Sequence, residues 1–450
     1  MADALLTAIA ASFAGLEGDG DEARHRARAG PVGRPDVSCF CLQAKIVATN
    51  VAWEHNPRMA VARYLQPDVL ADLGTKMVFV DGPRQVGKTT LARLCLETTP
   101  GVYLNWDNSR DRREIRAARW PATPALVVLD EVHKWRPWKR WLKGEYDAHG
   151  ARVRFLVTGS ARLDTYRRGG DSLQGRYHHY RLHPFSVAEL EARGGWRTPV
   201  PGRELEVGAD LGPAADHLRA LFEYGGFPEP LLAQSARTLR RWQRGRLERF
   251  FREDVRDLDT VRDLSLIEQF ADALPGRVGS PLSLNALRED LEVSHRAVTH
   301  WIDVLERLYH VALLRPFASR RVASLKRMPK AYLWDWSLVP DRAARFENLL
   351  ALHLLKFCHA LQDREGYDVD LWYLRDRAGR EVDFLLTFDR RPWFAVEAKL
   401  SEAAIDPSIR YFRDRLRIPW VYQVVLEGSR DTLDDGVRCV PAGSFLAALV

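Results

Sequence analysis

The sequence predicts an α/β protein with a P-loop core, a helix-turn-helix segment followed by a wing, and a C-terminal α/β domain. Three observations predict this organisation. Apolar, β-rich runs alternate with helical segments from residue 76 to about residue 185, which is typical of a parallel sheet with helices on both faces. A phosphate-binding loop pattern follows the first of these runs. A second set of apolar strands, with one helix before them, begins after residue 330.

The bulk composition is that of a globular protein with room for two or three domains in 450 residues. The formal net charge of +7 permits a polyanionic partner without establishing one. No apolar run approaches the length needed to cross a bilayer, so we expect a cytoplasmic protein without a membrane partner. The cysteines are scattered, odd in number and free of any C-x-x-C pair, which indicates reduced thiols: Cys39, Cys41, Cys95, Cys358 and Cys439.

Composition and periodicity divide the chain into four segments. Residues 1–57 are rich in Gly, Ala, Arg and acidic residues without a hydrophobic period, so we expect a disordered, dispensable N-terminal extension. A helix-like pattern begins near Met59. We expect residues 58–235 to form the P-loop domain, residues 236–330 a helical linker with a winged helix, and residues 331–450 the C-terminal domain.

The phosphate-binding loop has the form G-x-x-x-x-G-K-[ST], between the apolar run Met77–Val80 and a helical pattern. Its glycines let backbone N–H groups face a phosphate, and the helix N-terminus adds the positive end of its dipole. We expect Lys88 to reach the β- and γ-phosphates of ATP and the Thr89 hydroxyl to bind Mg²⁺. The predicted nucleotide-binding residues are Gly82, Pro83, Arg84, Gln85, Val86, Gly87, Lys88, Thr89 and Thr90.

Two later strands are expected to deliver polar residues to the same edge of the sheet, because the carboxyl ends of parallel strands lie together. The run Leu126–Leu129 is followed by Asp130, predicted to hold Mg²⁺, and Glu131, predicted to polarise the attacking water. The next strand ends at Gly159 and Ser160. Ser160 is predicted to sense the γ-phosphate or the water, and a plain Gly-Ser turn is the alternative.

The segment 282–330 predicts a helix-turn-helix with a wing. Asn285–Glu292 reads as a short helix, Ser294 as an N-cap and His295–Tyr309 as the second helix. A β-like return and a basic hairpin follow, with Arg320, Arg321, Lys326, Arg327 and Lys330. Such a module can read DNA with its second helix, with His295, Arg296 and His300 exposed, and it is also common as a purely structural part of ATPases.

The C-terminal segment contains a carboxylate set on predicted strands. Two paired strands would bring Asp383 and Glu397 to one end, and Glu347 would approach from the preceding helix. Such oxygen ligands suit Mg²⁺ or Mn²⁺. Lys399 lies on the same strand face as Glu397 and is expected to orient water or to stabilise developing charge. The spacing of these residues alone does not specify a site.

Five motifs in order carry a resemblance to a known family: GPRQVGKTTLA, LDEVHK, LVTGSA, SLQGRYHHYRLHPFS and GGFPEP. From Met59 onward the chain resembles prokaryotic AAA-type ATPases whose C-terminal domain is of uncharacterised function and PD-(D/E)XK nuclease-like. The resemblance implies a RecA/AAA-like core, and places Arg176 where a phosphate-sensing arginine could act in cis or toward a neighbouring subunit of a homo-oligomer. A structural ion pair is the alternative role. Glu347, Asp383, Glu397 and Lys399 match the PD-(D/E)XK arrangement, although EVDF replaces its Pro-Asp.

The sequence therefore predicts an ATP-binding, Mg²⁺-dependent ATPase whose nucleotide switch is coupled to a nuclease-like domain that binds or cleaves DNA. The alternative is a non-cleaving, ATP-dependent regulator that keeps a degenerate nuclease fold for binding DNA or a partner. In a third hypothesis, the basic regions are subunit contacts only.

Overall fold

The computed structural model describes residues 61–120, 123–159, 173, 175–191, 198–208, 212–256, 263–318 and 328–450. The predicted N-terminal extension, residues 1–57, lies outside this range.

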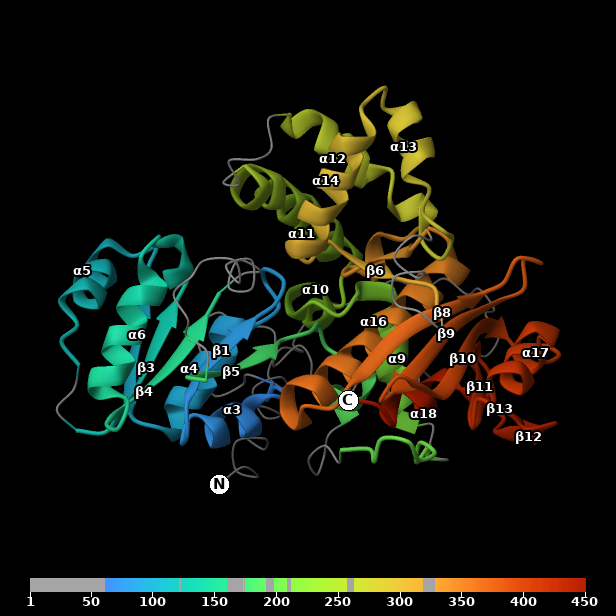
Figure 1. The fold of residues 1–450 in the computed structure, drawn as a ribbon, viewed down its shortest axis with the longest axis horizontal. Helices are drawn as coiled ribbons and strands as arrows, with labels where there is room; N and C mark the ends of the chain where they lie inside the picture. The colour runs from blue at the N-terminus through green and yellow to red at the C-terminus, as the bar shows by residue number, and fades with distance from the viewer. Residues whose placement is uncertain are drawn as a thin grey trace, which may run out of the picture. The chain divides into compact units, whose positions relative to one another are not determined.

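The P-loop domain is built on a five-stranded sheet in which every pairing is parallel, in the order β2-β3-β4-β1-β5 (Figure 1). Its strands are β1 (Met77–Asp81), β2 (Gly101–Asn105), β3 (Ala125–Asp130), β4 (Val153–Thr158) and β5 (Tyr177–Arg181). The helices are α3 (Gln66–Asp72), α4 (Lys88–Thr98), α5 (Ser109–Ala117), α6 (Trp138–His149) and α8 (Val187–Glu191), with a 3-10 turn η2 (Val132–Lys134). The predicted alternation of strands and helices is confirmed.

Alternate residues of each strand supply two separate cores, because successive side chains of a strand point to opposite faces. Val78 and Val80 of β1 pack with α3 and α4 on one face. Met77 and Phe79 pack on the other face with α5 and α6, where Trp138 is buried. Both faces are covered, which explains why β1 and β3 are apolar along nearly their whole length.

A helical segment follows the P-loop domain. It contains α9 (Gly212–Tyr224), α10 (Pro228–Ala233), α11 (Ala236–Arg249), a π-helical turn η4 (Phe250–Val255), α12 (Leu264–Asp272), a 3-10 turn η5 (Pro275–Arg277), α13 (Leu284–Asp290) and α14 (His295–Arg307). Ser294 caps α14 by accepting a hydrogen bond from the Ala297 N–H, as predicted. Strand β6 (Val311–Leu314) then pairs antiparallel with β7 (Lys330–Leu333).

The basic hairpin between β6 and β7 is described only in part. Arg320, Arg321, Lys326 and Arg327 lie outside the described residues. Lys330 does not belong to an exposed wing: its side chain is 1% exposed and faces the C-terminal domain. On the second helix, His295 and Arg296 are exposed as predicted, whereas His300 is half-buried.

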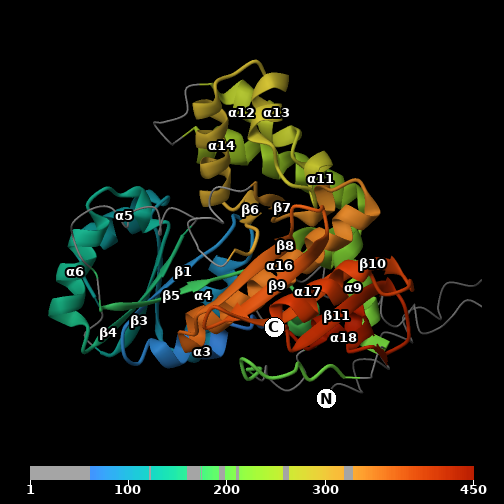
Figure 2. The same cartoon turned by 45° about the vertical axis from the view of Figure 1, so that its right-hand side comes forward.

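The C-terminal domain contains a six-stranded mixed sheet in the order β12-β13-β11-β10-β9-β8. Strands β8, β9, β10 and β11 can be followed in Figure 2, and β12 and β13 in Figure 1. Its strands are β8 (Val369–Arg375), β9 (Glu381–Phe388), β10 (Arg391–Ser401), β11 (Trp420–Glu427), β12 (Thr432–Asp434) and β13 (Val437–Pro441). Its helices are α16 (Arg342–Glu365), α17 (Pro407–Leu416) and α18 (Ala442–Ala447), after a 3-10 turn η6 (Trp336–Leu338). The 24-residue α16 packs on one face of this sheet, and Ile409 and Phe412 of α17 pack on the other.

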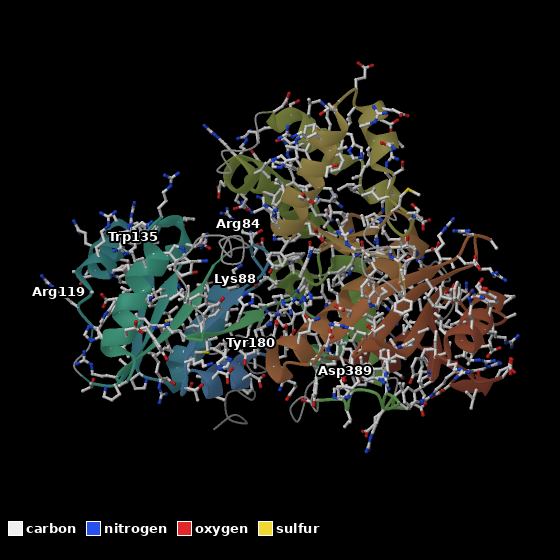
Figure 3. All side chains as sticks on the ribbon, viewed as in Figure 1. Arg84, Lys88, Arg119, Trp135, Tyr180 and Asp389 are labelled. Carbon is white, nitrogen blue, oxygen red and sulfur yellow. The ribbon has the colours of Figure 1, made fainter. Side chains whose placement is uncertain are left out.

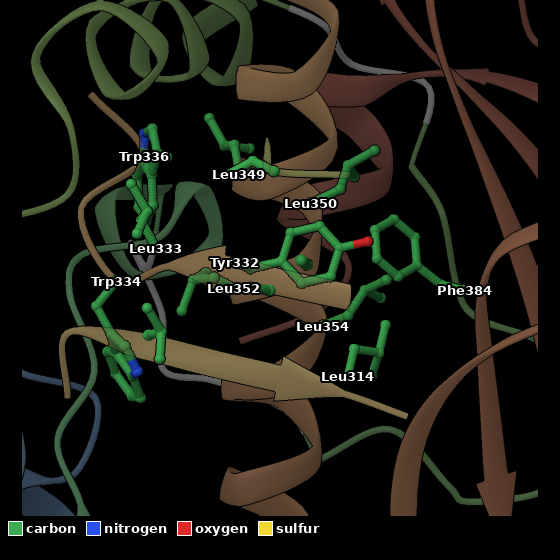
Figure 4. Packing of buried hydrophobic residues seen from close by; sticks show 14 of the residues in the cluster. Leu314, Tyr332, Leu333, Trp334, Trp336, Leu349, Leu350, Leu352, Leu354 and Phe384 are labelled. Atoms are coloured by element: carbon green, nitrogen blue, oxygen red, sulfur yellow. The ribbon is translucent and has the colours of Figure 1, made fainter. Parts of the chain in front are cut away.

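The β6–β7 hairpin is bound to the C-terminal domain by a shared apolar core. Tyr332 of the hairpin lies beside Leu350 of α16, and Leu314 lies beside Leu354 (Figure 4). The Tyr332 ring centroid is 5.9 Å from that of Phe384 on β9. Burial of these apolar surfaces fixes the position of Lys330, two residues before Tyr332, against the carboxylates of the neighbouring strands.

Candidate functional site

The phosphate loop runs from the carboxyl end of β1 to the start of α4. Gly82 has φ 147°, and a Cβ there would collide with the carbonyl oxygen of Leu182. Gly87 has φ 102° and caps α4. A side chain is excluded at Gly82 by sterics and disfavoured at Gly87 by its positive φ, so both positions keep the loop backbone uncovered. Arg84, Gln85 and Val86 fill the loop between them.

Lys88 is buried in this loop and bonds to loop backbone. Its Nζ donates to the carbonyl oxygens of Gly82 at 2.9 Å and Pro83 at 2.8 Å. Burial lowers the pKa of Lys88, and the carboxylates of Glu131 and Asp130 oppose that shift. Arg84 and Lys88 both lie at the carboxyl end of β1 (Figure 3). The ammonium therefore sits at the position predicted to receive phosphate.

Asp130, at the end of β3, connects the loop to the neighbouring strands. It accepts hydrogen bonds from the hydroxyls of Thr89 at 3.0 Å and Thr158 at 2.7 Å, and from the Tyr103 hydroxyl. Thr89 and Asp130 thus offer one hydroxyl and one carboxylate at one place. This donor set suits Mg²⁺ when phosphate oxygens and water complete the shell. Tyr103 and Thr158 orient the carboxylate and were not predicted.

Glu131 follows Asp130 in the left-handed region, with φ 57°. That backbone conformation is uncommon for a non-glycine residue and turns the chain sharply at the end of β3. Its carboxylate lies 3.4 Å from Lys134 Nζ and 3.7 Å from His133 Nε2. The side chain is half-buried at the sheet edge, next to the loop, and its water-polarising role stays a prediction.

Two arginines tie the loop to the rest of the chain. Arg63 Nη1 donates to the Val86 carbonyl at 2.6 Å, and its Nε pairs with Glu189 at 2.7 Å. Arg84 pairs with Glu253 and, at 3.1 Å, with Asp254, both in the π-helical turn η4. No motif points to Arg63, because its partners lie far away in the sequence.

Two further residues of this domain were predicted to act on the nucleotide, Ser160 and Arg176. Ser160 lies outside the described residues. Arg176 precedes β5, where Tyr177 pairs with Met77 at the amino end of β1. A strand of five residues places it roughly 16 Å from the phosphate loop. It bonds Asp147 at 2.8 Å instead. A role in cis is therefore incompatible with this placement, and a role toward a neighbouring subunit stays a prediction.

The structure brings the four predicted C-terminal residues together. The Ala398 N–H donates to Asp383 Oδ2 at 3.0 Å, and the Asp383 N–H donates to Glu397 Oε2 at 3.4 Å. Lys399 Nζ lies 2.9 Å from Glu397 Oε1. Glu347 reaches the same cluster from α16, where its Oε1 accepts a hydrogen bond from the Tyr332 hydroxyl at 2.7 Å.

Sequence reasoning missed two members of this carboxylate cluster, Lys330 and Glu381. Lys330 Nζ lies 2.7 Å from Glu381, 2.9 Å from Glu347 and 3.4 Å from Asp383. Within the residues that the structure describes, no group of three or more His, Cys, Asp and Glu side chains is arranged to hold a metal ion. The predicted metal site at Glu347, Asp383 and Glu397 is therefore not formed in this arrangement.

The protonation of the cluster follows from burial and crowding. Burial raises the pKa of Glu347 to about 7 and that of Glu397 to about 8, and the charge of Asp383 adds to both shifts. Burial by itself would lower the pKa of Lys330, but the charges of Glu347, Asp383 and Glu381 outweigh it and raise that pKa. The lysine therefore stays charged, and Glu347 and Glu397 hold a proton more tightly than an exposed glutamate does.

Comparison with known proteins agrees with the loop geometry. Residues 74–191 match a family described as AAA domain (AAA_14), and residues 215–348 and 343–445 match two domains of unknown function, DUF8612 and DUF4143. Residues 74–191 therefore form an AAA-type P-loop ATPase domain. In the described part of the chain, no helix is both long enough and apolar enough to cross a membrane.

Two of the similar proteins are named as uncharacterized. The uncharacterized protein Rv2008c of Mycobacterium tuberculosis is 25% identical over 382 residues, covering 82% of this chain and 81% of that protein. The uncharacterized protein MJ1544 of Methanocaldococcus jannaschii is 20% identical over 302 residues, covering 65% of each. Among solved structures, the Thermotoga maritima RuvB Holliday junction branch migration motor has 15% identity and a TM-score of 0.27, covering 57% of this chain and 90% of that chain.

Proposed function

We propose that the protein binds ATP with Mg²⁺, hydrolyses it at the P-loop, and passes the change of nucleotide state to its C-terminal domain. The observation that carries this proposal is the convergence of Lys88, Thr89, Asp130 and Glu131 at the carboxyl edge of one parallel sheet. Backbone N–H groups of the loop and the first turn of α4 supply further donors for an anionic phosphate.

The side chains at this edge fit the groups that hydrolysis requires. The Lys88 ammonium bonds two neutral carbonyls, and a phosphate oxygen would be a stronger partner because it is charged. Thr89 and Asp130 would hold Mg²⁺, which supplies positive charge to offset that of the phosphates. Glu131 would orient the attacking water. Each role falls to a residue already within the site.

The route that we propose to the C-terminal domain runs through Arg63. This guanidinium bonds the loop carbonyl of Val86 and pairs with Glu189, and Glu189 pairs in turn with Lys356 of α16 at 2.7 Å. A displacement of the loop on phosphate binding would therefore move an ion pair that α16 shares. Such a chain of buried charges can bias two arrangements of a rigid element.

Further polar contacts along α16 support this route. His359 Nδ1 lies 2.8 Å from His183 Nε2, and Asp363 accepts a hydrogen bond from the Arg181 N–H at 2.9 Å. One row of polar side chains at helical spacing on α16 therefore faces the chain from β5 to α8: His353, Lys356, His359 and Asp363. α16 thus faces the P-loop domain over about three turns.

ATP turnover tests the first part of the proposal. Lys88→Ala is expected to reduce turnover at least 100-fold with loss of ATP binding, whereas Glu131→Gln is expected to keep binding and lose turnover to a similar extent. Lys76→Ala, at the opposite end of β1, and Glu114→Gln, exposed on α5, are the matched controls. Turnover that survives Lys88→Ala would contradict the assignment of the loop.

Hydrogen exchange tests the proposed route. A non-hydrolysable ATP analogue at saturating concentration should change amide protection in residues 353–363 of the wild-type protein. Arg63→Met should abolish that change while the analogue still binds, and Arg219→Met, a change at an exposed site on α9, should preserve it. An unaltered response in Arg63→Met would contradict this route and show that the coupling takes another path.

We also propose DNA as a partner, contacted through a winged helix formed by α13, α14 and the β6–β7 hairpin. Support comes from the net charge of +7 and from the exposed His295 and Arg296 at the start of α14. Mobility shifts on duplex DNA at rising salt should show a steep salt dependence of the binding affinity, which Arg296→Ala should weaken.

A homo-oligomer in which Arg176 meets a neighbouring subunit remains a prediction. Whether DNA is cut or only held depends on the C-terminal carboxylates.

A further inference from the structure

A buried lysine occupies the centre of the C-terminal carboxylate cluster. Lys330 Nζ lies within 3.4 Å of carboxylate oxygens from Glu347, Glu381 and Asp383, and its side chain is 1% exposed. An ammonium has three donors and no acceptor, so three carboxylates satisfy it completely.

The lysine comes from a different segment than the acids. It is the first residue of β7, held by pairing with Leu314 of β6 and by an isolated bridge to Pro281. The acids belong to α16 and β9. Secondary structure thus fixes the backbone of the lysine and of the three acids. Burial of the Lys330 side chain restricts its movement within the cluster.

This arrangement does not fit a divalent cation. A divalent ion would need the same Glu347 and Asp383 oxygens that Lys330 contacts, and its charge would lie beside a buried ammonium. Two further oxygens of the cluster are engaged as well: Asp383 Oδ2 accepts from the Ala398 N–H, and Glu397 Oε1 lies 2.9 Å from Lys399 Nζ. Consistent with this, the described side chains include no group of three or more His, Cys, Asp and Glu residues that could hold a metal ion.

We propose that Lys330 is the resident cation of the carboxylate cluster, supplying the positive charge that a nuclease-like site would take from a divalent ion. While Lys330 is in place the site binds no metal and cuts no DNA. The C-terminal domain then acts by binding alone. This inference is independent of ATP hydrolysis at the P-loop.

Manganese binding to the full-length, nucleotide-free protein tests the proposal. Titration followed by electron paramagnetic resonance should show that no Mn²⁺ site of the wild-type protein depends on Asp383. Any Mn²⁺ binding by the wild type should therefore persist in Asp383→Asn. Lys330→Met frees the carboxylates, so it should create one Mn²⁺ site at least tenfold tighter than any in the wild type. The double variant with Asp383→Asn should lose that site.

Thermal unfolding gives a second readout. Mn²⁺ should raise the melting temperature of Lys330→Met and leave that of the wild type unchanged, because a ligand stabilises only the state that it binds. Lys356→Met removes a buried, ion-paired lysine elsewhere on α16 and should create no Mn²⁺ site.

Three results would overturn the proposal. One is a wild-type Mn²⁺ site that Asp383→Asn abolishes. Another is plasmid nicking by the wild type that the same substitution abolishes. The third is a folded Lys330→Met protein that binds no Mn²⁺. If Lys330→Met does not fold, the comparison of wild type with Asp383→Asn decides between resident lysine and metal.

Discussion

Removing the charge of Glu189 should destabilise the protein more than removing either of its cationic partners. Glu189 accepts from Arg63 Nε at 2.7 Å, from the Tyr64 N–H at 3.0 Å and from Lys356 Nζ at 2.7 Å. Burial would raise the pKa of Glu189, but the charges of Arg63 and Lys356 outweigh it and lower that pKa. The carboxylate is therefore the common counter-ion of two buried cations.

The size of the effect follows from what each substitution leaves behind. Glu189→Gln leaves two buried cations without a counter-ion, and breaking a buried pair in this way costs about 3–5 kcal/mol. Lys356→Met leaves Glu189 paired with Arg63 and removes charged hydrogen bonds, which costs about 1–3 kcal/mol. Lys356 can also release its proton. Burial lowers its pKa to about 8, although the charge of Glu189 opposes this shift.

Urea unfolding at pH 7 measures both variants. With an m-value of about 3 kcal/mol/M, Glu189→Gln should move the midpoint down by about 1 M or more, and Lys356→Met by less. A lysine with a lowered folded-state pKa binds fewer protons when folded than when unfolded. Stability therefore rises as the pH rises above the folded-state pKa, toward the unfolded pKa of about 10.4. Without Glu189 this rise should begin at lower pH.

Two outcomes would refute the reasoning. One is a loss of less than 1 kcal/mol in Glu189→Gln, which would mean that water or another acid already compensates the cations. The other is a larger loss in Lys356→Met than in Glu189→Gln, which would make packing, and not charge, the dominant contribution of this network.

Three further predictions concern the P-loop domain. Gly82→Ala should destabilise the protein by more than about 2 kcal/mol and abolish ATP binding, because the φ of Gly82 is 147° and a Cβ there has no space. The control Gly175→Ala should cost about 1 kcal/mol, because Gly175 has φ 82° but open surroundings. Tyr103→Phe should raise the Mg²⁺ concentration for half-maximal turnover about tenfold, because Asp130 loses a hydrogen bond that orients it. Arg176→Ala should leave ATP turnover unchanged at high dilution. A loss of turnover that appears only at high protein concentration would support a role between subunits. A loss of turnover at every concentration would contradict the placement of Arg176 away from the loop.

The phosphate loop could be predicted because its chemistry is contiguous in the sequence. Two glycines, a lysine and a threonine within eight positions define the backbone path, and the direction of parallel strands brings Asp130 to the same edge. For Arg176 the sequence left three roles open: in cis, toward a neighbouring subunit, or in a structural ion pair. Arg176 precedes β5, so a parallel strand carries it to the amino edge of the sheet, and only the pairing of Tyr177 with Met77 makes this evident.

The parts that escaped prediction depend on contacts between distant segments. Arg63 and Lys356 meet at Glu189 across separations of 126 and 167 residues. The sequence predicts Lys330 to belong to a basic hairpin because nearby residues are basic. In the structure Lys330 begins strand β7, which is buried. Charge patterns along the chain do not show which charges lose their water on folding.

The ion pairs along α16 also bear on how the protein can be dissected. A fragment that ends before residue 331 would lack Lys356 and Asp363, leaving Glu189 with one fewer cation and Arg181 without its carboxylate. An isolated C-terminal fragment would expose the same groups from the other side. Exchange of the C-terminal domain between relatives should therefore succeed only when the polar row on α16 and its hydrogen-bond partners from β5 to α8 are transferred together.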